Sequence, residues 1–192
     1  FNIEKNKLKY FSILVFEKII ILSFHFYFVK LISSDYYGLY NQTNFISSIF
    51  QNILMFGVAI PFLINISSSK SNFNKFFFNF YGVVSLVACL LIFIVFILLS
   101  HYFSYVFYGE TIYFNYIIIL MIVTFSDIFS EYVILYNRIR NKLISHSTYI
   151  ITRTVIRVFS LLFIYYITES FFIAFLISSI CYLLYSVYVS RE

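Results

Sequence analysis

The chain has 192 residues, of which 62% are hydrophobic, 24% aromatic and only 11% charged, and its net charge is +5. Soluble domains carry about 25% charged residues on average, so this composition excludes an ordinary soluble domain and indicates an integral membrane protein. The basic residues are dispersed along the chain and do not gather on one face, which argues against nucleic-acid binding.

Six apolar segments are long enough to cross a bilayer as helices, which takes about 20 residues each. In chain order they cover residues 11–32, 44–65, 76–100, 116–136, 147–167 and 171–190. We therefore predict an all-α integral membrane protein, in which six transmembrane helices form one bundle and one domain over residues 1–192.

The positions of lysine and arginine predict the orientation of these spans. Basic residues occur before the first span, between the second and third, between the fourth and fifth, and after the sixth. The connections 33–43, 101–115 and 168–170 contain none. Because cytoplasmic loops are enriched in Lys and Arg, both termini are predicted to be cytoplasmic. The second outer connection is also rich in aromatic residues, which leaves open a short helix lying on the membrane.

Gly57 and Pro61 predict a bend in the second span. A proline ring clashes with the carbonyl group four residues earlier and removes one helical hydrogen bond, and Gly57 occupies that earlier position. The bend is interpreted as a static kink that aids packing or, alternatively, as a moving hinge.

Charged residues inside the apolar segments are the candidates for function. Charge at membrane depth is costly, and it usually faces a bundle interior or a water-filled cavity. Apart from Lys30 at the outer end of the first span, six such residues occur, two in each of the first, fourth and fifth spans: Glu17, Lys18, Asp127, Glu131, Arg153 and Arg157. They indicate either a transport pathway or structural ion pairs.

Helical rise, about 1.5 Å per residue, places the acidic residues of the fourth span level with the basic residues of the fifth. Asp127 is expected at the depth of Arg157, and Glu131 at the depth of Arg153. If these faces are turned towards each other, two ion pairs are predicted. Glu17 and Lys18 are expected at a depth similar to that of Arg153.

Several of these features occur in an order that is known from one family. They are the expected turn at 35–40 (Asp-Tyr-Tyr-Gly-Leu-Tyr), the second span with Phe56-Gly57, and the basic loop 137–146 before an arginine-bearing fifth span. In this the chain resembles the N-terminal lobe of the polysaccharide flippases, which belong to the superfamily of multidrug, oligosaccharidyl-lipid and polysaccharide exporters.

The resemblance implies translocation of a lipid-linked oligosaccharide, a sugar repeat unit on a polyprenyl diphosphate, across the cytoplasmic membrane for cell-surface polysaccharide such as lipopolysaccharide or capsule. Arg153 and Arg157 then become candidates for the substrate path, because the guanidinium fork matches phosphate oxygens, together with Glu17 and Lys18. Family members have two six-helix lobes, so the expected partners are the lipid-linked oligosaccharide, membrane lipids and a second lobe in a longer parent protein.

Three alternatives stay open. A multidrug or cation exporter of the same superfamily would favour acidic cavity residues such as Glu17, Asp127 and Glu131. A membrane-embedded glycan enzyme would need a clustered acid/base set, and a non-transporting scaffold would neutralise every buried charge internally. The sequence contains no phosphate-binding glycine-rich loop and no Cys/His spacing typical of a metal site, so we expect a non-enzymatic protein without cofactor or metal.

Overall fold

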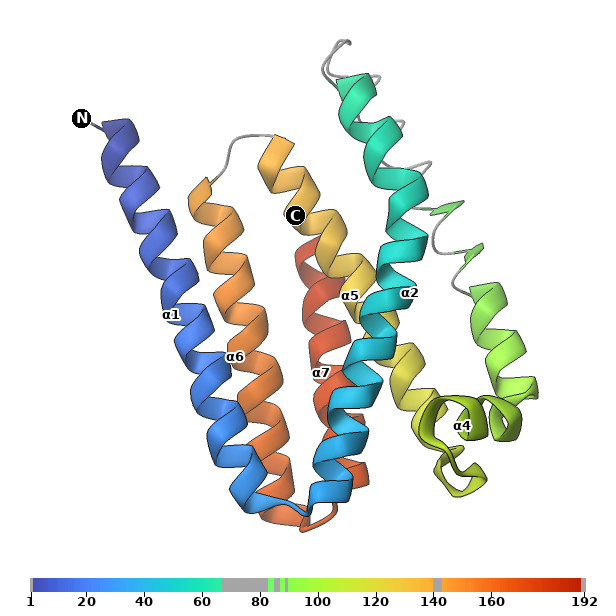
Figure 1. Cartoon of the computed structure of the whole chain (residues 1–192). Coiled ribbons are helices and arrows are strands. Elements are labelled where there is room, and N and C mark those ends of the chain that lie inside the picture. Colours follow the sequence, from blue (N-terminus) through green and yellow to red (C-terminus); the bar gives the residue numbers. More distant parts are fainter. Residues whose placement is uncertain (1, 67–82, 85–86, 89, 140–142, 191–192) are drawn as a thin grey trace.

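The computed structural model describes residues 2–66, 83–84, 87–88, 90–139 and 143–190, and it places no strand among them (Figure 1). Its long helices are α1 (Asn2–Leu31), α2 (Ser34–Ile66), α5 (Tyr116–Ile139), α6 (Leu143–Thr168) and α7 (Phe171–Ser190). Two short elements, α4 (Ser100–Tyr108) and the 3-10 helix η1 (Thr111–Tyr113), precede α5.

Four of the described helices contain a segment long and apolar enough to cross a bilayer: Leu8–Leu31, Tyr116–Leu135, Ile144–Thr168 and Phe171–Val189. A bent pair, Leu90–Leu98 with Ser100–Tyr108, adds a fifth if it is counted as one broken span. These segments identify an all-helical, multi-pass membrane protein and match four of the six predicted spans. The predicted span 44–65 lies within the backbone of α2, but the side chains of its second half are not described, and the predicted span 76–100 includes residues outside the described part. The number six therefore stays a prediction.

The first connection is shorter than the sequence predicts. The segment 33–43 is not a loop, and the expected turn at 35–40 is wrong, because α2 begins at Ser34. The backbone N–H of Tyr36 donates to the Ser33 hydroxyl oxygen at 3.5 Å, as in an N-cap. Asp35 adds a negative charge in the first turn of the helix, where the helix dipole stabilises it.

The second connection contains the short helix that the sequence left open. Helix α4 follows residues Leu90–Leu98 after a bend of 92°. It ends at Gly109, whose φ of 80° is readily adopted only by glycine. The Thr43 and Tyr108 hydroxyl oxygens lie 2.9 Å apart in a buried hydrogen bond, which fastens α4 to α2.

Helix α5 forms the centre of the bundle and packs against α2, α6 and α7, while α6 lies between α1 and α7. Helices α1 and α2 diverge from their short connection, which lies beside the connection between α6 and α7 at the end of the bundle opposite the N-terminus (Figure 1). This arrangement fits the predicted alternation of the spans. It also places α1 against α6 and leaves an open cavity between α1 and α5.

The predicted bend in the second span lies within α2, whose backbone is helical as far as Ile66. Beyond this helical backbone, nothing is described at Gly57 and Pro61, so both the kink and the hinge stay predictions.

Candidate functional site

An open cavity of about 350 Å³, referred to below as the groove, brings together four of the six predicted charged residues. Its charged lining residues are Glu17 and Lys18 from α1, Glu131 from α5 and Arg153 from α6. Its remaining walls are apolar, with Ile134 and Ile150 among them. Glu17 and Arg153 each lie nine residues into their spans, which corresponds to a depth of about 14 Å.

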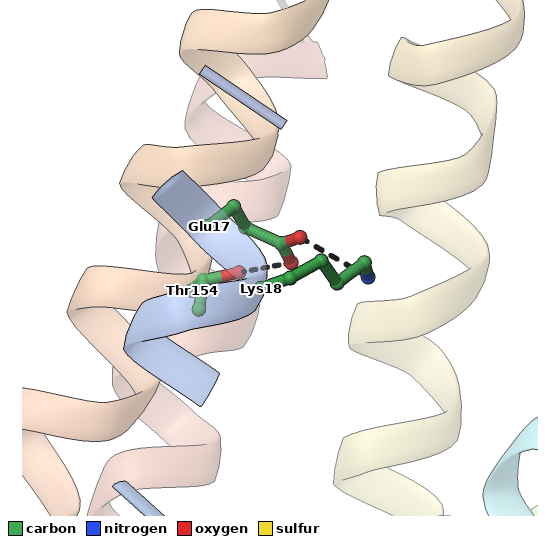
Figure 2. A network of polar contacts seen from close by, with 3 residues as sticks. All are labelled: Glu17, Lys18 and Thr154. Carbon is green, nitrogen blue, oxygen red and sulfur yellow. Dashed lines mark hydrogen bonds and ion pairs between the residues drawn. The ribbon is translucent and has the colours of Figure 1, made fainter. Parts of the chain in front are cut away.

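Glu17 joins two helices at the edge of the groove, as Figure 2 shows. The side chain is only 3% exposed. Its Oε1 accepts a hydrogen bond from the Thr154 hydroxyl at 3.1 Å, which ties α1 to α6. This bond explains why a carboxylate is tolerated here, because a buried charge needs hydrogen-bond partners.

The second carboxylate oxygen of Glu17 is less well satisfied. The ammonium group of Lys18 lies 3.1 Å from Oε2, but Oε2 accepts no hydrogen bond from the described residues. Consecutive residues on a helix do not face each other, so the ion pair is poorly oriented, and the Lys18 side chain is 76% exposed. In Figure 2 this side chain extends from α1 towards α5. Oε2 therefore retains the capacity to accept a hydrogen bond from another donor.

The predicted ion pair between Glu131 and Arg153 is wrong. Lys18 with Glu17 is the only ion pair within the described part of the chain. Glu131 and Asp127 both lie within electrostatic range of Arg153, and Glu131 shares the groove with it, but neither carboxylate contacts the guanidinium group. Among the described residues, the donors of Arg153 are thus left available to another anion.

The predicted ion pair between Asp127 and Arg157 is also wrong, because neutral side chains satisfy each charge. Asp127 accepts hydrogen bonds from the Ser47 hydroxyl at 2.8 Å and the Tyr182 hydroxyl at 3.0 Å. Arg157 donates to the side-chain oxygen of Asn44, and its guanidinium carbon lies 5.3 Å from the centre of the Tyr182 ring. Tyr182 therefore contacts both charged side chains and takes the place of the direct ion pair that was predicted between them.

The sequence interpretation did not include Tyr182 or the hydroxyl groups around it. The Tyr182 and Ser130 hydroxyl oxygens lie 2.9 Å apart, and Tyr149 donates to Ser130 at 3.0 Å. Ser186 also contacts Ser130, at 3.0 Å. One signal was present: Ser178, Tyr182 and Ser186 recur every four residues in an apolar helix, which places them on one face.

The six charged residues thus divide between two environments. Asp127 and Arg157 belong to a hydrogen-bonded cluster among α2, α5, α6 and α7, whereas the other four line the groove. Within the described residues, no three His, Cys, Asp or Glu side chains are placed to hold a metal ion. The groove contains both cationic donors and anionic acceptors, which suits recognition of a charged ligand.

No family model matches the sequence, and neither a curated protein nor a solved structure matches it. The likeness to the polysaccharide flippases therefore rests on the sequence features, and the function has to be argued from the groove.

Proposed function

We propose that this chain belongs to a flippase that moves a polyprenyl-diphosphate-linked oligosaccharide across the cytoplasmic membrane, and that the groove is part of the substrate path. The observation that carries the proposal is the 76% exposure of the Lys18 side chain, ten residues into a segment that is long and apolar enough to span the bilayer. A lysine facing lipid near the centre of a helix is unfavourable by roughly 2.5 to 3.5 kcal/mol on insertion scales. The groove is therefore best explained as facing water or a polar ligand.

The cations of the groove suit a diphosphate. Arg153 offers a planar fork of donors that matches phosphate oxygens, and Lys18 adds a mobile point charge from α1. Arg157 is already bound to Asn44 and Tyr182. We accordingly assign the phosphate contact to Arg153 and Lys18, and we assign Arg157 a supporting role.

Six helices with cytoplasmic termini and a second six-helix lobe facing the groove complete the proposal. A single open groove shields a polar headgroup on one side only, and a path between two lobes encloses it while the lipid tail stays outside. The six helices and their orientation rest on the apolar segments and on the positions of Lys and Arg, and the second lobe rests on the resemblance described above.

The test compares two lysines of α1 in the full-length protein. Lys18→Ala and Arg153→Ala should each lower surface polysaccharide at least tenfold and cause lipid-linked precursor to accumulate. Lys30→Ala is the matched control, because Lys30 is exposed at the far end of the same helix, and it should have no effect. Normal surface polysaccharide in the Lys18→Ala, Arg153→Ala double variant, at normal protein level, would refute the proposal.

The acidic residues of the groove favour a second candidate, a multidrug or cation exporter of the same superfamily. Glu17 has an oxygen without a hydrogen bond from the described residues, and Glu131 shares the cavity, so the same groove could accept a cationic drug. In that case Glu17→Gln should abolish efflux of a cationic dye while surface polysaccharide stays normal. Loss of polysaccharide without any change in dye efflux would exclude this candidate.

A further inference from the structure

We infer that the groove recognises a ligand that carries a positively charged group and a negatively charged group together. If the proposed function is correct, on which this identification of the ligand rests, the ligand is a lipid-linked glycan that contains a sugar with a free amino group. The inference starts from the four charges that line one cavity, two carboxylates and two cations.

Only two of these four charges contact each other. Among the described residues the sole ion pair joins Lys18 to its neighbour Glu17, and its cation is exposed while its anion is buried. Glu131 and Arg153 line the same cavity without forming an ion pair. A structural clamp would bring these two groups together, whereas a binding site keeps them apart for a ligand.

The two carboxylates of the groove fit an ammonium group. Oε2 of Glu17 is buried and receives no hydrogen bond from the described residues, and an ammonium group has three donors to offer. Glu131 provides a second carboxylate on the facing helix. The absence of a third metal-ligating side chain among the described residues makes an organic cation a better match than a divalent metal ion.

The two cations of the groove fit a phosphate, and one of them, Lys18, also contacts a carboxylate. Lys18 contacts Glu17 through a flexible, exposed side chain, so an arriving ammonium group can replace it at Oε2. The released lysine is then free to join Arg153 on the phosphate. A ligand with phosphate alone would take Lys18 from Glu17 and leave that buried carboxylate without a cation, which is unfavourable. The positive group of the ligand removes this penalty.

The size of the cavity is compatible with such a ligand. Its volume of about 350 Å³ lies at the lower end of the range of small-molecule sites, which is about 300 to 1,000 Å³. A single phosphorylated amino sugar is therefore a suitable probe.

The experiment uses the full chain purified in detergent and measures binding by calorimetry. The probes are glucosamine 6-phosphate, which carries both charges, and N-acetylglucosamine 6-phosphate, in which the amino group is neutral. We expect the first to bind at least tenfold more tightly. Glu17→Gln should remove this preference and retain binding of the N-acetylated probe, which shows that the variant is folded. Glu110→Gln, a change in the exposed outer connection, is the matched control and should keep the preference.

Equal affinity for the two probes, or a preference that survives Glu17→Gln, would overturn the inference. Arg153→Ala should lower the affinity for both probes by a similar factor, since each carries phosphate. An unchanged affinity would also contradict the inference. The proposed function fails separately. If the preference for the amino group is observed while the Lys18 and Arg153 variants make normal surface polysaccharide, the groove serves another ligand with both charges.

Discussion

Arg157 and Arg153 lie one turn apart on α6, but we expect their loss to lower stability by very different amounts. Arg157→Ala removes a hydrogen bond to Asn44 and the contact with the Tyr182 ring. A hydrogen bond to a charged group contributes about 1.5 to 3 kcal/mol, and a desolvated cation–π contact contributes about 2 kcal/mol. The free energy of unfolding should therefore fall by roughly 3 to 5 kcal/mol, with the lower value expected in a bilayer. Arg153 contacts no described residue by hydrogen bond or ion pair, so Arg153→Ala should lower it by less than about 1 kcal/mol.

The measurement is an equilibrium unfolding titration in mixed micelles with increasing SDS, followed by far-UV circular dichroism. Two Tyr182 variants separate the contributions, because Tyr182→Phe keeps the ring over Arg157 and removes only the hydroxyl that binds Asp127, whereas Tyr182→Leu removes both. In a double-mutant cycle, Arg157→Ala should couple to Tyr182→Leu and not to Tyr182→Phe. If Arg157→Ala proves as stable as Arg153→Ala within about 0.5 kcal/mol, the assignment of Arg157 to a structural cluster is refuted.

Three further outcomes are expected. Single cysteines can be placed in a variant without native cysteines and tested with an impermeant thiol reagent in intact cells. Cysteines at the predicted outer turns, Ser33, Glu110 and Glu169, should react. Labelling of a cysteine at Ser145, near the start of α6, would reverse the topology. Glu169 has a φ of 52° directly after α6, where glycine is favoured, so Glu169→Gly should raise the thermal unfolding midpoint, and a lowered midpoint would contradict that strain. Tyr108→Phe deletes the buried bond to Thr43 and should lower stability by about 1 kcal/mol; stability equal to the wild type would show that α4 is fastened by packing alone.

The length of the predominantly apolar segments was sufficient to locate most of the membrane-spanning helices. The segment predicted at 116–136 corresponds to Tyr116–Leu135, and the one predicted at 171–190 corresponds to Phe171–Val189. The length of an apolar segment does not show where a helix begins when its first turns consist of polar residues. The early beginning of α2 depends on a local hydrogen bond to Ser33, and its first turns were therefore mistaken for a loop.

Helical rise predicted which buried charges lie at the same level but did not identify their partners. Asp127 and Arg157 were expected at one level, and the single side chain of Tyr182 does contact both of them. The rise per residue contains no information on how each helix is rotated about its axis, and that rotation decides which side chains meet. A prediction based on charged residues also omits neutral partners such as Ser47, whose hydroxyl donates one of the two hydrogen bonds to Asp127.

The difference between the two groups of charges favours a transporter over a scaffold. Thr154 and Glu17 already connect α1 to α6 through a hydrogen bond, so that contact does not require Lys18 or Arg153. Each of these cations adds roughly 2.5 to 3.5 kcal/mol to the free energy of insertion when it lies near the middle of a span. In the hydrogen-bonded cluster among α2, α5, α6 and α7, the corresponding penalty for Arg157 is offset by Asn44 and Tyr182. In the groove, the described residues give Arg153 no hydrogen bond or ion pair, although Asp127 and Glu131 lie within electrostatic range of it, and Lys18 has only its exposed pair with Glu17. Water or a charged ligand can supply the missing direct contacts.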